Sequence, residues 1–133
     1  MLTTLRLQDF RCYSTLRWDI PAEGAILIGA NAQGKTNAAE AIFFLCTGYS
    51  PRANKDKLVV KTGEEVADIS GVAGSEYGDI SVRILFNVAD KKRIFINGLE
   101  VLKVGEIFGN INSVFFNPQE LKLVQESPED RRR

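Results

Sequence analysis

Histidine is absent from this 133-residue chain, which excludes imidazole-based acid–base, nucleophilic and metal chemistry within it. Cysteine is scarce: Cys12 and Cys46 have neither the spacing of a metal motif nor the number of a disulfide framework. We expect Cys46 to pack as a small apolar side chain. Excess charge is also missing, because 17 lysines and arginines balance 17 aspartates and glutamates. Net charge therefore gives no indication of a nucleic-acid or membrane partner.

Long apolar runs are lacking as well. No stretch approaches the roughly 20 residues of a membrane-spanning helix, and the first residues lack the apolar core of a signal peptide. We therefore expect a cytoplasmic protein with no membrane partner. What is present is the composition of an ordinary globular protein, with 44% hydrophobic and 26% charged residues. The length allows one core but is small for a complete phosphate-loop enzyme.

The most informative stretch is a glycine-rich loop. The pattern G-x-x-x-x-G-K-[ST] is present at Gly29, Gly34, Lys35 and Thr36. An apolar run at residues 25–28 precedes it and predicts a strand buried on both faces.

A helix is expected to follow the loop. Its predicted span runs from Lys35 to about Thr47, because Ala38, Ile42 and Leu45 recur at helical spacing. Gly48 stands where a helix C-cap is expected.

Strand, loop and helix together predict a phosphate ligand. Glycines let the backbone turn tightly and direct several N–H groups at one anion, and the positive end of the helix dipole favours the same anion. Lys35 can reach the outer phosphates, and the Thr36 hydroxyl can ligate Mg²⁺. The alternative is a glycine-rich turn with a solvated lysine. The residues predicted to bind ATP in this loop are Gly29, Ala30, Asn31, Ala32, Gln33, Gly34, Lys35, Thr36 and Asn37.

Alternating apolar residues predict strands around this centre. Residues 4–8 and 15–20 alternate and indicate a hairpin around residues 9–12, followed by a turn at 21–24. Further strands are expected in series, which favours an antiparallel sheet. Their ranges are 66–73, 80–86, 93–96 and 99–101, with an Asn97-Gly98 turn between the last two.

The last third of the chain predicts three more elements. We expect a short helix at residues 104–108 closed by Gly109, and a buried strand at residues 114–116. Ser127, Pro128 and Asp130 have the types and spacing of a helix start that the chain enters but does not complete. We therefore interpret the chain as a piece of a longer protein.

Three segments resemble the RecF family of the SMC/Rad50-like ABC ATPases, and the resemblance covers the whole chain. The opening LRLQDFRCY is similar to the family's first strand and its Phe-Arg-x-Tyr turn, and GANAQGKTNAAEAI is similar to its phosphate loop and helix. The stretch VFFNPQELKLVQESPEDRRR resembles the segment that follows the family's antiparallel region.

The sequence departs from the family pattern at a few positions. Ala38 and Ala39 stand where two leucines are usual, which reduces the packing face of the helix. Tyr49 replaces a common arginine and leaves Arg52 as the nearest cation. Ala32 replaces a glycine common in the wider class, so the loop must avoid positive φ there or tolerate it at a cost.

Several side chains leave two interpretations open. By the resemblance, Arg11 approaches the nucleotide, Arg52 lies near the phosphates, and Gln119 joins Thr36 on Mg²⁺. The alternatives are a solvated hairpin residue, a loop cation and a surface glutamine, respectively. Residues 131–133 form either a basic DNA patch or one turn of a helix with paired arginines.

The resemblance implies an α/β fold, namely the N-terminal portion of a P-loop ABC/SMC-type ATPase head over residues 1–133. That portion has a mixed sheet around the P-loop helix and an antiparallel β subdomain at residues 60–101. The whole protein would bind ATP and Mg²⁺ and form an ATP-dependent homodimer. It would act on gapped or single-strand/duplex junction DNA with a recombination mediator such as RecR, in DNA replication, recombination, repair and the SOS response.

The resemblance also implies that this chain binds ATP without hydrolysing it. In the family, the Walker B carboxylate and the signature motif lie beyond residue 133, and whole proteins are weak DNA-dependent ATPases. Residues 84–90 form an apolar run ending in an acid, but Asn87 interrupts it, so we reject it as Walker B. If turnover were found, Glu40, Asp90 and Glu120 would be the carboxylates to substitute. No catalytic residue is predicted here.

Two other interpretations remain. One is a head fragment of another SMC/Rad50-like DNA-repair ATPase, in which a coiled coil would follow. The other is a P-loop small-molecule kinase or a GTPase, which would need an acidic base or a guanine-specificity motif that we do not find.

Overall fold

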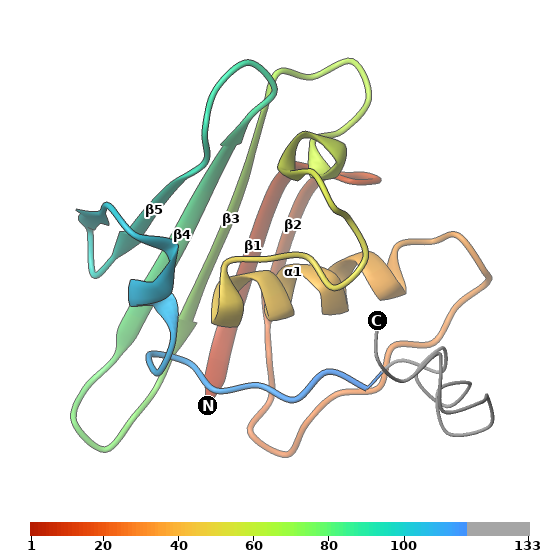
Figure 1. Cartoon of the computed structure of the whole chain (residues 1–133). Helices are drawn as coiled ribbons and strands as arrows, with labels where there is room; N and C mark the ends of the chain where they lie inside the picture. Colours follow the sequence, from red (N-terminus) through yellow and green to blue (C-terminus); the bar gives the residue numbers. More distant parts are fainter. Residues whose placement is uncertain (117–133) are drawn as a thin grey trace, which may run out of the picture.

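A six-stranded antiparallel sheet with one helix packed across its face forms the body of the computed structural model, which describes residues 1–116 (Figure 1). The strand order is β2-β1-β3-β4-β5-β6. The strands are β1 (Leu2–Phe10), β2 (Tyr13–Asp19), β3 (Val66–Ala73), β4 (Ile80–Asn87), β5 (Arg93–Ile96) and β6 (Leu99–Val101). The predicted hairpin and the predicted antiparallel series are therefore confirmed, and both belong to one sheet.

One face of this sheet is apolar because side chains alternate along each strand. The register aligns Leu7 of β1 with Ile69 of β3, and Ile69 with Ile84 of β4, which pairs in turn with Ile94 of β5. All four side chains are buried. The period-two pattern of the sequence thus decides which face of the sheet receives the helix.

The helix α1 (Lys35–Thr47) covers that face and confirms the predicted helix. Phe44 meets Phe86 of β4 edge to face, with ring centroids 4.9 Å apart. Cys46 is buried as expected, and burial raises the pKa of its thiol. Gly48 ends the helix at φ 74°, and its N–H donates to the Phe44 carbonyl at 2.7 Å. This left-handed cap confirms the predicted C-cap.

Two connections also match their predictions. Asn97 and Gly98 have φ of 49° and 80°, as a tight hairpin turn between β5 and β6 requires. Val104–Ile107 forms a short 3-10 helix, and Gly109 follows it at φ 85°. A second 3-10 helix, Asp56–Val59, lies in the connection between α1 and β3.

Two predicted strands are wrong. Residues 25–28 form no strand, and Ile26 and Ile28 are 88% and 91% exposed. Residues 114–116 form none either, and Val114 is 97% exposed. An apolar run indicates a need for burial, but a strand buried on both faces also requires a hydrogen-bonded neighbour and covering layers. Within residues 1–116 neither segment has a strand paired beside it, although Phe115 packs against Phe43 of α1.

The mixed sheet predicted around the P-loop helix is accordingly antiparallel throughout residues 1–116. The predicted helix starting at Ser127, the basic residues 131–133 and the predicted metal ligand Gln119 lie outside the described residues. In residues 1–116, α1 is too short to span a lipid bilayer, as are the 3-10 helices.

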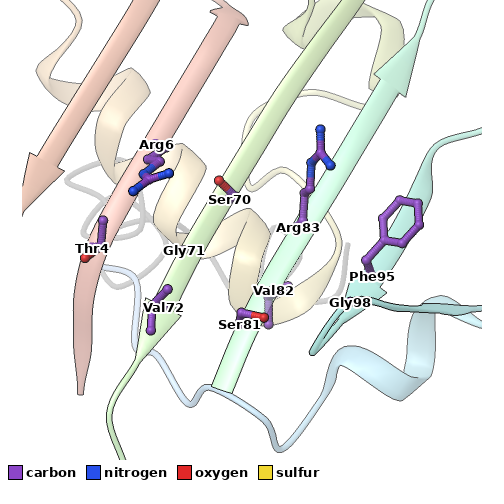
Figure 2. Close-up of a pocket in the computed structure, with 10 residues that line it drawn as sticks. All are labelled: Thr4, Arg6, Ser70, Gly71, Val72, Ser81, Val82, Arg83, Phe95 and Gly98. Atoms are coloured by element: carbon purple, nitrogen blue, oxygen red, sulfur yellow. The ribbon is translucent and has the colours of Figure 1, made fainter. Parts of the chain in front are cut away.

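The face of the sheet opposite α1 bears the side chains of Arg6, Ser70 and Arg83, and we call it the open face (Figure 2). A shallow hollow of about 440 Å³ lies there, with α1 behind the sheet. One cross-strand row in it consists of Arg6, Ser70, Arg83 and Phe95. Arg83 is already paired with Asp68 at 2.6 Å. The hollow has no glycine-rich loop or helix end beside its arginines, so we place the candidate phosphate site at the other side of the sheet.

Candidate phosphate-binding site

The loop at residues 29–34 leads directly into the first turn of α1. Gly34 has φ 94°, a left-handed conformation that glycine adopts at little cost, and α1 begins at the next residue. No side chain caps this helix start. The first N–H groups of α1 therefore keep their capacity to bind an anion, with the positive end of the helix dipole behind them.

Ala32 adopts a positive φ of 64° within this loop. The sequence left open whether the loop avoids or tolerates such a value, and the structure shows that it tolerates it. A side chain in the left-handed region costs about 1–2 kcal/mol, because Cβ approaches the following carbonyl oxygen. Strain of this kind is typical of loops whose shape serves a ligand.

Lys35 folds back over the loop rather than extending into solvent. Its Nζ donates to the carbonyl oxygens of Gly29 and Ala30 at 2.7 and 2.5 Å. The amide oxygen of Gln33 accepts the Ala30 N–H at 3.1 Å. The side chain is half-buried and both contacts are exposed, so Lys35 is held at the loop and still meets solvent. Two carbonyl oxygens and one N–H group of the loop therefore have partners within the motif, and the ammonium already lies there.

The first hairpin packs against the end of the phosphate loop where α1 begins. The Tyr13 hydroxyl donates to the Gly34 carbonyl at 3.1 Å, and burial raises the pKa of this hydroxyl, which keeps it a donor. A Cβ at Gly34 would lie 2.7 Å from Cys12 Sγ and 2.9 Å from the Tyr13 ring. Asn37 Nδ2 donates to the same sulfur at 3.3 Å. Cys12 of the turn and Tyr13 at the start of β2 thus both contact the start of α1.

Thr36 is exposed at the first turn of α1. Its hydroxyl makes no hydrogen bond to another group of residues 1–116 and is free to ligate a cation beside a bound phosphate. The position of the Thr36 hydroxyl is therefore compatible with its predicted role as a ligand of Mg²⁺. The second predicted metal ligand, Gln119, lies outside the described residues.

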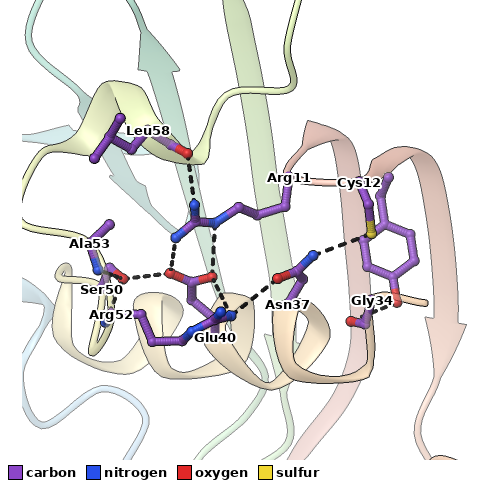
Figure 3. Close-up of polar contacts among 10 residues, drawn as sticks. Arg11, Cys12, Gly34, Asn37, Glu40, Ser50, Arg52, Ala53 and Leu58 are labelled. Carbon is purple, nitrogen blue, oxygen red and sulfur yellow. Dashed lines mark hydrogen bonds and ion pairs between the residues drawn. The ribbon is translucent and has the colours of Figure 1, made fainter. Parts of the chain in front are cut away.

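Arg11 forms an ion pair with the buried carboxylate of Glu40, so its alternative as a solvated hairpin residue is wrong (Figure 3). Its Nε and Nη2 donate to the two carboxylate oxygens of Glu40 at 3.0 and 2.7 Å, and its Nη1 donates to the Leu58 carbonyl at 2.9 Å. Glu40 is completely buried on α1. An approach of Arg11 to a nucleotide stays a prediction.

The sequence reasoning missed Glu40 as a structural centre. Its carboxylate also accepts the Ser50 hydroxyl at 2.5 Å, and Arg52 Nη1 lies 3.7 Å from it. The same Arg52 nitrogen donates to Asn37 Oδ1 at 3.2 Å. A sign was available in the sequence, because Glu40 is an acid flanked by Ala39 and Ala41 within an otherwise apolar helical stretch. Such an acid requires a buried partner.

Tyr49, where the family usually has arginine, packs against a lysine. Lys92 Nζ lies 4.6 Å from the Tyr49 ring centroid and donates to the Gly48 carbonyl at 2.6 Å. It also pairs with Asp56 at 3.0 Å. A cation at the C-terminal end of α1 stabilises the helix dipole, so this departure from the family pattern serves packing at the end of the helix away from the loop.

Comparisons with known proteins agree with this geometry. A family model described as an AAA domain matches residues 4–130. The DNA replication and repair protein RecF of Clostridioides difficile is 41% identical over 131 residues, 98% of this chain and 35% of that protein. RecF of Clostridium acetobutylicum is 39% identical over 132 residues, 99% of this chain and 36% of that protein. The chain therefore spans about a third of the length of these relatives.

Solved structures give the same fold. A structure of the recombination mediator protein RecF with ATP superposes with a TM-score of 0.87 and 31% identity, over 99% of this chain and 37% of that one. A structure from work on ATP-driven dimerisation and DNA-stimulated activation of SMC ATPases has a TM-score of 0.82 at 20% identity, over 98% of this chain and 95% of that one. At that identity, the second comparison supports the fold alone.

Proposed function

This chain belongs to the AAA domain family, and we propose that it is the ATP-binding portion of a RecF-type DNA replication and repair protein. Within it, the backbone of residues 29–37 would bind the phosphates of ATP, with Lys35 as the charged contact. The observation that carries this proposal is the uncapped start of α1 directly behind a strained glycine-rich loop on which the Lys35 ammonium already lies.

Mg²⁺ is proposed as the second ligand. The Thr36 hydroxyl would hold it beside the outer phosphates, and Gln119 is the proposed partner ligand. When bound, the ion neutralises phosphate charge. We also propose that Arg11 contacts the nucleotide in the whole protein. In this structure its donors are directed to Glu40 and Leu58.

The role of the whole protein rests on its relatives. We propose residues 1–133 as the N-terminal portion of an ATPase head, with residues 60–101 as its antiparallel β subdomain. The complete protein would dimerise with ATP, bind single-strand/duplex junction DNA and act in the cytoplasm with a mediator such as RecR. Named RecF relatives and the RecF–ATP structure support this proposal. This chain alone is proposed to bind ATP without turnover.

The test is a titration of the purified chain with a fluorescent ATP analogue, with and without Mg²⁺. Lys35→Ala removes the ammonium that neutralises phosphate, so we expect an affinity loss of about tenfold or more in both conditions. Thr36→Ala removes a metal ligand, so it should weaken Mg²⁺-loaded ATP much more than metal-free ATP, and Thr36→Ser should be mild. Circular dichroism checks that each variant keeps its fold.

Lys91→Ala and Thr62→Ala are the matched controls, since both side chains are exposed and belong neither to the motif nor to α1. They should bind as the unaltered chain does. Unchanged affinity in a folded Lys35→Ala variant would reject the phosphate assignment. Equal losses for Thr36→Ala with and without Mg²⁺ would reject the metal assignment.

A further inference from the structure

The Gln33 side chain folds back across the phosphate loop. Its amide oxygen accepts the Ala30 N–H at 3.1 Å, so the contact closes the loop over Asn31 and Ala32. Gln33 is exposed, and water competes for both groups of such a hydrogen bond, so the bond stabilises the loop only weakly. A stronger acceptor can therefore displace the Gln33 oxygen from Ala30.

The same oxygen lies beside the charged end of Lys35. A Cβ at Gly29 would be 2.8 Å from Gln33 Oε1 and 4.0 Å from Lys35 Nζ, so both atoms lie near the side of Gly29 on which a side chain would project. Backbone N–H groups and an ammonium group are the donors that a phosphate loop offers to its ligand. In this loop, one donor of each kind lies next to a neutral amide oxygen.

Other contacts hold the shape of the loop. Lys35 Nζ donates to the carbonyl oxygens of Gly29 and Ala30 at 2.7 and 2.5 Å, which ties the start of α1 to the start of the motif. At the other end of the loop, the Tyr13 hydroxyl donates to the Gly34 carbonyl at 3.1 Å. Loss of the Gln33 amide would leave these hydrogen bonds in place, so the loop would keep its conformation without it.

A phosphate oxygen competes with this amide oxygen for the same donors. Hydrogen bonds to an ionised acceptor are about twice as strong as bonds between neutral groups, so a phosphate is the better partner for the Ala30 N–H. The exchange still breaks one hydrogen bond within the protein, and the affinity falls by the fraction of molecules in which that bond is closed. An internal acceptor in a binding loop thus lowers the affinity of the loop.

We propose that the Gln33–Ala30 hydrogen bond is an autoinhibitory contact of the phosphate loop. The Gln33 amide oxygen takes an N–H group of the motif beside the Lys35 ammonium, and a phosphate ligand has to displace it before the loop binds fully. The contact therefore lowers the affinity for ATP and for a simpler polyphosphate by the same factor. This inference rests on the proposed function, because it requires phosphates at residues 29–37.

The test compares three substitutions of Gln33 in the whole chain, read with the fluorescent ATP analogue. Gln33→Ala removes the internal acceptor, so it should tighten binding about threefold, as the loss of one competing neutral hydrogen bond predicts. Gln33→Asn keeps the amide on a side chain that is one methylene shorter and no longer reaches Ala30, so it should tighten binding to the same extent. Gln33→Glu places a carboxylate beside the Ala30 N–H and Lys35, and this charged acceptor should weaken binding about tenfold.

Two readouts link the change in affinity to the contact itself. The Ala30 amide proton should exchange with solvent faster in Gln33→Ala than in the unaltered chain, because its acceptor is gone. Inorganic tripolyphosphate, used as a competitor of the fluorescent analogue, should gain the same factor of affinity as ATP. Gln8→Ala on β1 is the matched glutamine control, since Gln8 is exposed and lies outside the motif, and it should change none of these quantities.

Unchanged or weaker ATP binding in a folded Gln33→Ala variant would overturn the inference, because Gln33 would then be neutral or would brace the loop for its ligand. Gln33→Glu binding as tightly as Gln33→Ala would overturn it as well. The proposed function is tested separately by Lys35→Ala. If that variant loses binding while Gln33→Ala binds as the unaltered chain does, the phosphate site stands and the role of Gln33 is rejected. If Lys35→Ala binds normally, both are rejected.

Discussion

Single residues decide the conformation of the phosphate loop. The motif glycines could be recognised in the sequence because only particular spacings let backbone N–H groups converge on a phosphate. The strain at Ala32 could be stated only as an alternative, since its φ depends on how the loop closes through Gln33 and Lys35. The apolar neighbours of Glu40 indicate a buried acid, but its partners Arg11 and Ser50 could not be predicted, because they lie outside its helix.

Gly34→Ala should be much more costly than Gly24→Ala. Both glycines have positive φ, 94° and 99°, so both substitutions introduce strain of about 1–2 kcal/mol. Only at Gly34 would the new Cβ meet neighbours, Cys12 Sγ at 2.7 Å and the Tyr13 ring at 2.9 Å, while nothing lies within 4 Å at Gly24. Overpacking adds about 1–3 kcal/mol, and urea unfolding would measure the difference. Equal losses in the two variants would contradict this packing of the hairpin turn on the loop.

Whole elements were predicted well where the pattern was local. Strands β3, β5 and β6 have the predicted bounds, because alternating side chains and a strong Asn-Gly turn are properties of the segments themselves. The strands expected at residues 25–28 and 114–116 failed for the opposite reason. Each apolar run requires neighbouring strands and covering layers, and the sequence of the run itself does not identify the segments that supply them.

The crossing of α1 over the sheet gives a prediction at this scale. A Cβ at Gly71 of β3 would lie 2.7 Å from Leu45 Cδ1 and 3.2 Å from the backbone oxygen of Thr4. Gly71→Ala should therefore push the helix from the sheet and cost about 1–3 kcal/mol of unfolding free energy. Gly74→Ala is the matched control, because its nearest contacts are ordinary, at 3.6 and 3.8 Å. A thermal melt in which both variants match the unaltered chain would disprove this close approach.

The whole molecule has zero net charge but two local arrangements of positive charge on opposite sides of one sheet. The phosphate loop joins an ammonium to a free helix start. The open face has Arg6 and Arg83 in one cross-strand row, but in the described residues no helix start lies beside these arginines. Sequence reasoning identified the first because motif and helix are contiguous, and missed the second because its residues meet only through strand pairing.

An NMR titration of the ¹⁵N-labelled chain with Mg²⁺-loaded ATP distinguishes these two faces and tests the central claim that nucleotide phosphates bind at the loop. We predict large, saturable shifts of the backbone amides of Gly34, Lys35 and Thr36, which disappear in Lys35→Ala. Shifts confined to Arg6, Ser70 and Arg83 on the open face, with the loop amides unmoved, would contradict it.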